Sequence, residues 1–238
     1  VGIEGRVATL TVHGPTEAPT RSADAWFLRG FRELNDALLR IRVNHPDVGL
    51  MLIKTAGDAE LLAAHESYVL DGAADDWFLE ECRHYQARTL RKVDNMAKSM
   101  FALIEEGHNF NGVLFELALA ADRSYMFRDD DGENTVSTSA SNAGAYLMAH
   151  GQTRLQARYP GDTDAPGKVL GHDGAIDADG ADEHGLVTAA LDDIDYEDEV
   201  RIAVEERISL SPDALTGMEQ NLRFVGAETC ETKIYGRL

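Results

Sequence analysis

The sequence has few cysteines and no long apolar run. Cys82 and Cys230 lie far apart and show no metal-ligand spacing, so neither a disulfide framework nor a zinc site is indicated. No apolar run approaches the roughly 20 residues that a membrane-spanning helix needs. The chain starts at Val1 without a charged and then apolar leader, so we expect no signal peptide, and this start fits a fragment boundary. These absences predict a soluble protein of a reducing, cytoplasmic compartment with no membrane partner.

Positive charge is scarce in the sequence. The chain has 22 Lys and Arg against 42 Asp and Glu, a formal net charge of −20. A surface this acidic argues against nucleic acid and anionic membranes as partners, because like charges repel. The basic residues are seventeen Arg and only five Lys. Acid-rich, lysine-poor surfaces suit a salty cytoplasm, where ions screen the self-repulsion, but an ordinary acidic surface explains the composition equally well.

The segment 99–127 is the part of the sequence around which the chain is organised. It contains an apolar run at 100–104, a glycine-containing turn, an apolar helix at 112–121 and a second apolar run at 125–127. Apolar strands joined through a helix are typical of a parallel or mixed sheet in a layered α/β domain. With 238 residues, 44% of them hydrophobic, the chain is long enough for one large domain of this class.

Other periodic patterns flank this segment. Apolar or alternating runs predict strands at 6–12, 48–55, 135–139 and 186–191. Helical spacing and capping signals predict helices at 25–43, 77–93, 153–159, 196–208 and 213–225, the last opened by Ser211 and Pro212. Segment 61–69 fits either a loop or a short helix. The acidic, glycine-rich stretch 173–185 lacks the acid positions of an EF-hand loop, so we expect a solvated turn there.

Several motifs together carry a family resemblance. Glu-Leu-Ala at 116–118 is followed by Asp122, Ala-Gly ends an earlier strand at 56–57, and Gln-Thr-Arg-Leu and Gly-Leu-Val follow at 152–155 and 185–187. In this combination the chain resembles the crotonase (enoyl-CoA hydratase/isomerase) superfamily over most of its length. In finer detail, the runs ALIEEG, ELALAADRSYM and RLQARY resemble the benzoyl-CoA-dihydrodiol lyase branch, also described as 2,3-epoxybenzoyl-CoA dihydrolase.

The resemblance implies a fold and an extent. It implies an α/β, ClpP/crotonase-like ββα spiral core over residues 1–195, followed by C-terminal helices in a truncated segment 196–238. Members of the branch are much longer than this chain, which would therefore correspond to the second, crotonase-like half. We also expect a homo-oligomer.

The resemblance further implies an oxyanion hole, a pair of backbone N–H groups that binds the thioester oxygen of an acyl-CoA substrate. Alignment on Glu116 places the helix donor at Val113, beside Gly112. Alignment on Gly57 places the loop donor near Ala63. A preorganised pair of donors of this kind contributes several kcal/mol in the transition state, and the helix dipole adds to it.

Glu116 matches the first catalytic glutamate of the family. Its apolar setting would raise its pKa toward the range of a general acid or base. The second family glutamate falls on Ala140 here, which argues against simple hydratase chemistry. Asn142 and Glu105 are candidates for the missing polar group, and further local candidates are Glu106, His108 and Asn109.

The same residues also have structural explanations. Glu116 could be a structural carboxylate that is paired with an Arg. Glu105 and Glu106 fit a solvated strand end, and His108 and Asn109 are common turn formers. The histidines show no metal spacing, so no metal site is expected.

Three functions are open at this point. The first is a crotonase-type lyase or hydrolase that opens the ring of 2,3-epoxybenzoyl-CoA, or of its dihydrodiol, to a semialdehyde acyl-CoA and formate. The second is a generic enoyl-CoA hydratase or isomerase, against which the missing second glutamate speaks. The third is a non-catalytic half that binds acyl-CoA or mediates assembly. Coenzyme A is part of the acyl-CoA thioester substrate in the enzymatic cases, so no separate cofactor is expected.

Overall fold

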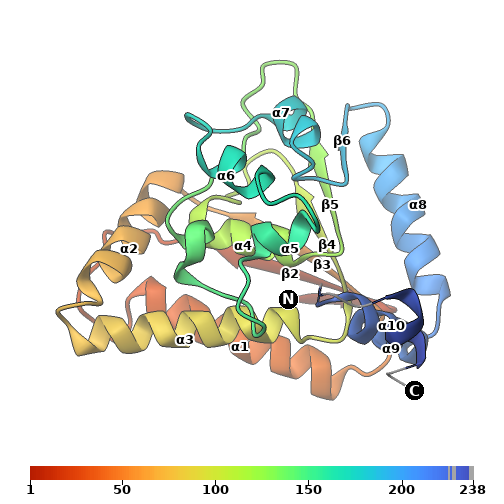
Figure 1. Ribbon diagram of the computed structural model, residues 1–238, viewed down its shortest axis with the longest axis horizontal. Helices are drawn as coiled ribbons and strands as arrows, with labels where there is room; N and C mark the ends of the chain where they lie inside the picture. The colour runs from red at the N-terminus through yellow and green to blue at the C-terminus, as the bar shows by residue number, and fades with distance from the viewer. Residues whose placement is uncertain (225, 227–228, 236–238) are drawn as a thin grey trace.

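The centre of the protein is a six-stranded, mostly parallel sheet (Figure 1). The computed structural model describes residues 1–224, 226 and 229–235. The strands lie side by side in chain order: β1 Gly2–Glu4, β2 Val7–His13, β3 Leu50–Ala56, β4 Ser99–Ile104, β5 Arg123–Phe127 and β6 Ala189–Leu191. β1 is antiparallel to β2, and every later pair of neighbours is parallel. The α/β class predicted from the sequence is confirmed.

Helices cover both faces of the sheet, as a mainly parallel sheet requires. The larger core packs the sheet against helices from the first half of the chain: α1 Trp26–Asn44, α2 Ala59–Gly72, α3 Trp77–Asp94 and α4 Gly112–Ala120. The smaller core lies on the opposite face, where α8 (Tyr196–Ser209) packs on Leu50, Phe101 and Leu103. Figure 1 shows α8 along that side of the sheet.

Strand β4 illustrates why this sequence forms a central strand. All six of its residues are buried. Met100, Ala102 and Ile104 point into the larger core, while Phe101 and Leu103 point toward α8. Because successive side chains of a strand alternate between the two faces, a strand covered on both sides has to be continuously apolar. The strand, turn, helix and strand predicted for 99–127 are confirmed.

The predicted amphipathic helices are confirmed, with ends within one or two residues except for the last helix, which ends at Leu222. α1 buries the residues predicted from helical spacing: Phe27, Phe31, Leu34, Leu38 and Ile41. α3 begins at an Asp76 side-chain cap, and α5 (Arg154–Arg158) begins at a Thr153 and Gln156 capping box. α9 (Pro212–Leu222) begins at Ser211, whose hydroxyl accepts a hydrogen bond from the Ala214 amide. The predicted end of that last helix, Val225, lies outside the described residues.

One open assignment is settled and one prediction needs correction. Segment 61–69, which from its sequence fits either a loop or a short helix, is helical, because Asp58 caps α2 through the Leu61 amide. Segment 135–139 is not a strand: Val136 and Ser137 make only isolated bridges, to Ile176 and Asn111, so no ladder forms.

The acidic stretch 173–185 is also more ordered than a solvated turn. Asp177 caps a short helix, α7 (Ala178–Glu183), by accepting a hydrogen bond from the Gly180 amide. The last strand is shorter than predicted, since Leu186 and Val187 are buried in the larger core before β6 begins. The edge strand β1 is too short and too exposed to leave a sequence pattern.

The remaining elements are short. They are a π-helical turn at Ser141–Ala145, α6 Ala165–Leu170 and α10 Cys230–Tyr235. Cys82 is a buried free thiol, and the side chain of Cys230 lies outside the described part of the chain. Among the described residues, no helix combines the length and the apolar character needed to cross a membrane.

Candidate active site

The N-terminus of α4 is the place where the sequence predicted an oxyanion donor. Asn111 is the N-cap residue, so Gly112 and Val113 are the first two helical residues. The Gly112 amide is already bound, because it donates to the Ser137 carbonyl at 3.0 Å. The Val113 amide points away from the helix and donates to the Oε2 atom of Glu66 at 2.7 Å. The predicted donor is therefore in the first turn, as expected, and a carboxylate from α2 occupies it.

Glu66 is the residue that the sequence analysis did not find. It lies three residues after Ala63 in α2, and residues three apart share one face of a helix. No sequence pattern marks it, because its segment fits either a helix or a loop. The first indication of a role is geometric, since its carboxylate reaches the start of α4.

The predicted loop donor Ala63 needs correction. It is the fifth residue of α2, so its amide lies beyond the first-turn amides that lack an intrahelical acceptor. The cap residue Asp58 already binds the amides of Leu61 and Leu62, through its side chain at 2.8 Å and its carbonyl at 3.1 Å. The free donors of this helix end are consequently the amides before Leu61, at residues 58–60.

Glu116 is completely enclosed in the protein. Its side chain is 2% exposed, and both of its carboxylate oxygens are hydrogen-bonded. Oε1 accepts from the Asn142 amide at 2.7 Å, and Oε2 accepts from the Arg154 guanidinium. Burial raises the pKa of Glu116, while Arg154 and Asn142 act in the opposite direction.

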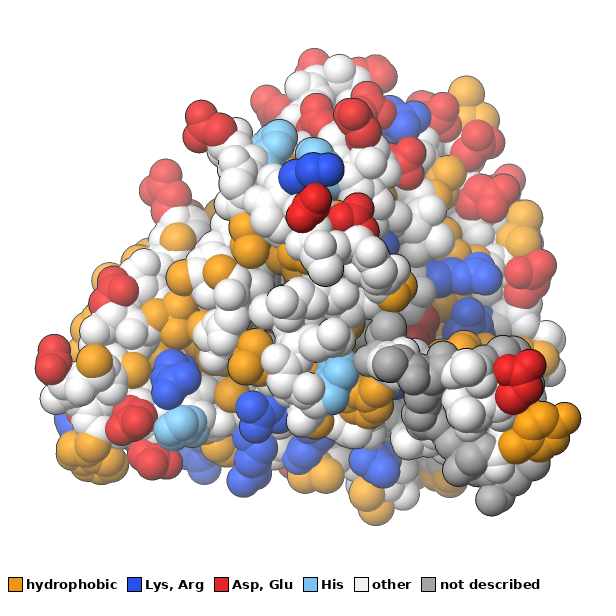
Figure 2. Space-filling model, viewed as in Figure 1, with side chains coloured by type: hydrophobic (Ala, Val, Ile, Leu, Met, Phe, Trp, Pro, Cys, Tyr) orange, Lys and Arg blue, Asp and Glu red, His pale blue; other side chains and the backbone are white. Residues whose placement is uncertain are grey.

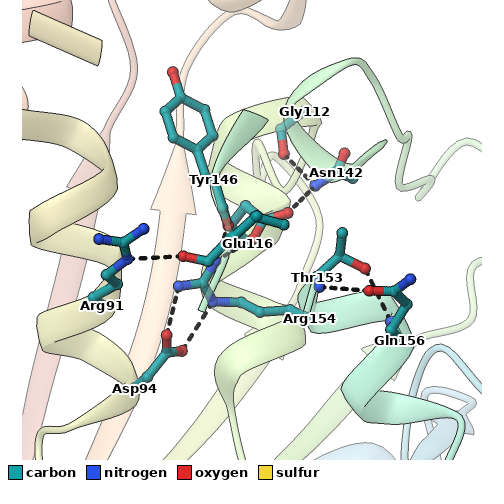
Figure 3. Close-up of polar contacts among 10 residues, drawn as sticks. Arg91, Asp94, Gly112, Glu116, Asn142, Tyr146, Thr153, Arg154 and Gln156 are labelled. Carbon is teal, nitrogen blue, oxygen red and sulfur yellow. Dashed lines mark hydrogen bonds and ion pairs between the residues drawn. The ribbon is translucent and has the colours of Figure 1, made fainter. Parts of the chain in front are cut away.

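Arg154 is the centre of a buried ion cluster. Its other two nitrogens form a bidentate pair with Asp94, at 2.9 and 2.7 Å, so one guanidinium lies between two carboxylates (Figure 3). It also donates to the Tyr146 carbonyl at 3.1 Å. Asp94 ends α3, Glu116 is in α4 and Arg154 begins α5, so the cluster ties three helices together. Glu116 thus has the arginine partner that its structural explanation requires.

Asn142 lies beside Glu116, as the prediction of a shared site requires. Its amide nitrogen donates to Glu116 and also to the Gly112 carbonyl at 3.1 Å, and its oxygen accepts from the Ser139 amide at 2.9 Å. The side chain is 1% exposed. These bonds give it a positioning role between α4 and the segment that contains Ser139 and Ala140.

Glu105 lies on the other side of the sheet from Glu116. It comes directly after β4 and shares the strand face of Phe101 and Leu103, which contact α8. Its carboxylate forms an ion pair with Lys54 of β3. The structure therefore does not bring Glu105 into one site with Glu116 and Val113. Strand alternation, which puts residues 104 and 105 on opposite faces, is the physical reason.

The polar residues of the turn before α4 are engaged in local bonds. His108 accepts from the Phe110 amide at 2.8 Å, and its pKa is lowered to about 4 by burial. Asn109 is bonded to Thr55 and to the Asp58 carbonyl, which joins this turn to the end of β3 and the start of α2. These contacts agree with turn formation.

Two cavities have walls that include His65 in one case and Asp94 and Arg154 in the other. One of about 580 Å³ lies between the end of β2, the segment after it and α1, and its wall includes His65, the neighbour of Glu66. A second of about 320 Å³ is lined by Asp94 and Arg154. Neither cavity is lined by any of the six residues predicted as site residues: Ala63, Glu105, Gly112, Val113, Glu116 and Asn142. Among the described residues, no three His, Cys, Asp or Glu side chains gather as a metal site would require.

Comparison with known proteins gives relatives in sequence and in fold. The chain is 43% identical over 247 residues to a benzoyl-CoA-dihydrodiol lyase of Aromatoleum evansii, a match that covers 100% of this chain and 44% of the relative. The chain thus spans less than half the length of that protein. No family model matches the sequence.

Solved structures agree with the sheet and helix arrangement. AtuE of Pseudomonas aeruginosa superposes with a TM-score of 0.70 at 18% identity, covering 100% of this chain and 86% of that one. An enoyl-CoA hydratase/isomerase of Marinobacter aquaeolei superposes with a TM-score of 0.69 at 15% identity, covering 99% and 86%. At this identity the likeness shows the fold, and the fold expected from the sequence is confirmed.

Proposed function

Because the chain has the crotonase fold and is related over its whole length to benzoyl-CoA-dihydrodiol lyase, we propose that it is part of an enzyme that opens an oxidised aromatic ring carried by coenzyme A. The observation that carries this proposal is the 43% identity to the Aromatoleum evansii protein. The proposed substrate is 2,3-epoxybenzoyl-CoA or its dihydrodiol. With water, the products are a semialdehyde acyl-CoA and formate.

The start of α4 supports an oxyanion role. The helix is buried along its whole length, and its positive end carries the Val113 amide, which has no intrahelical acceptor. The free amides at residues 58–60 begin α2 and lie beside the same turn, since Asn109 bonds the Asp58 carbonyl at 3.1 Å. We propose these amides, in place of Ala63, as the source of the second donor.

Glu116 is the proposed acid/base group. Burial raises its pKa, which is the direction that a carboxyl acting as general acid or base requires. Because Arg154 and Asn142 bind both of its oxygens, proton transfer requires one of these bonds to open. The proposed mechanism therefore includes the opening of a hydrogen bond from Arg154 or Asn142 to Glu116.

A second candidate function is favoured by the same contacts. Glu66 occupies the Val113 amide, and Arg154 holds Glu116, so the free chain presents neither an empty oxyanion hole nor an unbound carboxylate there. A non-catalytic crotonase-like half would show this arrangement, and the chemistry would then be carried out by residues elsewhere in a longer protein.

One substitution separates the two candidates. Glu116→Gln keeps the shape of the side chain and removes proton transfer, so it should abolish turnover of 2,3-epoxybenzoyl-CoA while acyl-CoA affinity stays within a few-fold. The assay uses this chain and a longer natural relative carrying the equivalent change, with crotonyl-CoA as the hydratase substrate. Glu197→Gln, an exposed change at the start of α8, is the matched control. Turnover at the unsubstituted rate in the Gln variant would remove Glu116 from the mechanism. Absence of turnover in this chain, together with unchanged turnover in the substituted longer relative, would favour the non-catalytic half.

A further inference from the structure

We propose that Glu66 is an internal competitor for the oxyanion position, so that an acyl-CoA thioester binds at α4 only by displacing its carboxylate. The inference rests on the proposed function, because it assumes that a thioester oxygen is the ligand of the Val113 amide. It adds a residue from α2 that sets the affinity of this site.

The contact itself is short and directed. Glu66 Oε2 lies 2.7 Å from the Val113 nitrogen, the distance of a strong charge-assisted hydrogen bond. The donor is a first-turn amide at the positive end of a buried nine-residue helix, which is a favourable place for one negative charge. A thioester oxygen that develops negative charge needs the same position for the same reason.

The surrounding backbone is shaped around this carboxylate. Gly112 has a φ of +46°, and a Cβ atom built on it would lie 2.3 Å from Glu66 Oε2 and 3.2 Å from Ser139 Oγ. A side chain at position 112 would therefore collide with Glu66. Glycine both permits the left-handed backbone and leaves the space that the carboxylate fills. The free protein thus contains a filled anion position at the predicted oxyanion hole.

Occupancy by Glu66 lowers the apparent affinity for any other acceptor. A single N–H cannot bind a carboxylate and a thioester oxygen at full strength together, so ligand binding includes the cost of releasing Glu66. A hydrogen bond to a charged group contributes about 1.5–3 kcal/mol, which corresponds to roughly a 10- to 100-fold change in a dissociation constant. The apparent dissociation constant rises by the inverse of the fraction in which the site is open.

The test compares three variants by calorimetric titration with benzoyl-CoA. Glu66→Ala removes the competitor and should bind roughly 10- to 100-fold more tightly than the unsubstituted protein. Glu66→Gln keeps a neutral acceptor and should fall between the two. Asp71→Ala removes an exposed carboxylate from the same helix and controls for the change of net charge. Equal affinities in Glu66→Ala and Asp71→Ala would overturn the inference.

A second measurement separates this inference from the proposed function. The Val113 amide proton should move upfield and exchange faster in Glu66→Ala than in Asp71→Ala, because it loses a strong acceptor. This shift needs no ligand. If no variant binds any coenzyme A thioester, the oxyanion role of this chain fails, and a shifted Val113 amide still supports Glu66 as the occupant. An unshifted amide overturns the inference whatever the titrations give.

Discussion

Arg154 is the single residue on which the three helices around α4 depend most. It carries one positive charge between the carboxylates of Asp94 and Glu116, and its side chain is 1% exposed. Removing the arginine leaves two buried carboxylates without a counter-charge, and breaking a buried ion pair in this way costs about 3–5 kcal/mol. We therefore predict that Arg154→Met lowers the free energy of unfolding by about this amount, as measured by urea denaturation with an unchanged denaturant slope.

A neutral version of the cluster is the matched comparison. Replacing all three members, with Asp94→Asn and Glu116→Gln added to Arg154→Met, removes the uncompensated charges and should recover much of the lost stability. Arg201→Met changes an exposed arginine of α8 and should have little effect. If Arg154→Met is no worse than Arg201→Met, the cluster does not stabilise the fold.

The sequence predicts the unusual residue here but not its partner. A Glu inside an apolar helix signals a special carboxylate, and the structure confirms that Glu116 is buried. Its partner Arg154 is 38 residues away, in the Gln-Thr-Arg-Leu motif, and nothing in that motif indicates that it pairs with Glu116. Glu66 is the opposite case, because its sequence context is that of an ordinary surface glutamate. It contacts the Val113 amide only because α2 packs beside α4. Tertiary placement decides both roles, and local pattern carries no information on it.

At the scale of elements, the start of α4 allows a test of the backbone donor. Val113→Pro removes the N–H but lets the helix start, since proline is tolerated in the first turn. If this amide stabilises an oxyanion, the loss should fall mainly on the chemical step, on the order of 10²-fold in kcat. Val113→Ala keeps the donor and should be mild.

Comparing these two folded variants identifies the cause. Circular dichroism and melting curves first establish that the proline variant is folded. An alanine variant that loses as much activity as the proline variant would show that side-chain volume, not the amide, is what matters at this position.

Helix α9 docks on the sheet through a third buried carboxylate. Glu219 accepts from the Ser99 hydroxyl of β4 at 2.9 Å, and Arg223 lies between it and Asp122. Burial, with the charge of Asp122 second, raises the pKa of Glu219 from its ordinary value of 4.5 to about 7. The folded protein therefore holds a proton that the unfolded chain releases between these pH values.

The sign of the pH effect follows from this proton. The contribution of Glu219 is fully present below pH 4.5 and is lost as pH rises through about 7. We predict that, from pH 5 to 8, the unsubstituted protein loses up to about 3 kcal/mol of its free energy of unfolding relative to Glu219→Gln. Glu206→Gln, an exposed change in α8, is the control. A difference that is independent of pH would contradict the prediction.

Elements with strong periodicity are predictable, whereas those defined by caps or by long-range pairing are not. The five buried positions of α1 follow from helical spacing alone. α2 and α7 depend on single capping aspartates, Asp58 and Asp177. From the sequence, the segment of α2 fits either a loop or a helix, and that of α7 is expected to be a turn. The residues 135–139 alternate like a strand, but no neighbouring strand is available to pair with them beyond isolated bridges.

At the scale of the whole molecule, charge is distributed unevenly. In the view of Figure 2, acidic side chains gather over the region of α7 and α8, and basic side chains gather along the edge formed by α1 and α3. Composition alone gives the net charge of −20 but not this separation. The acidic side must hold many like charges close together, so its self-repulsion exceeds that of an evenly mixed surface.

This repulsion leads to the prediction that stability rises with molar salt. The Debye length falls from about 10 Å at 0.1 M to about 3 Å at 1 M, which removes most repulsion between exposed carboxylates. A gain of about 1 kcal/mol would raise the melting temperature of a domain of this size by roughly 2–4 °C.

Potassium chloride is the appropriate salt, because sulfate and phosphate also strengthen apolar burial. Sucrose, which stabilises without screening, gives the comparison for excluded-solute effects. A variant in which several acidic residues near α7 are replaced by their amides should have a higher melting temperature at 0.1 M salt. Its melting temperature should also rise less when salt is added. A melting temperature that stays flat or falls between 0.1 and 1 M potassium chloride would show that the acidic surface does not limit stability, and the salt-adapted reading of the composition would lose its physical basis.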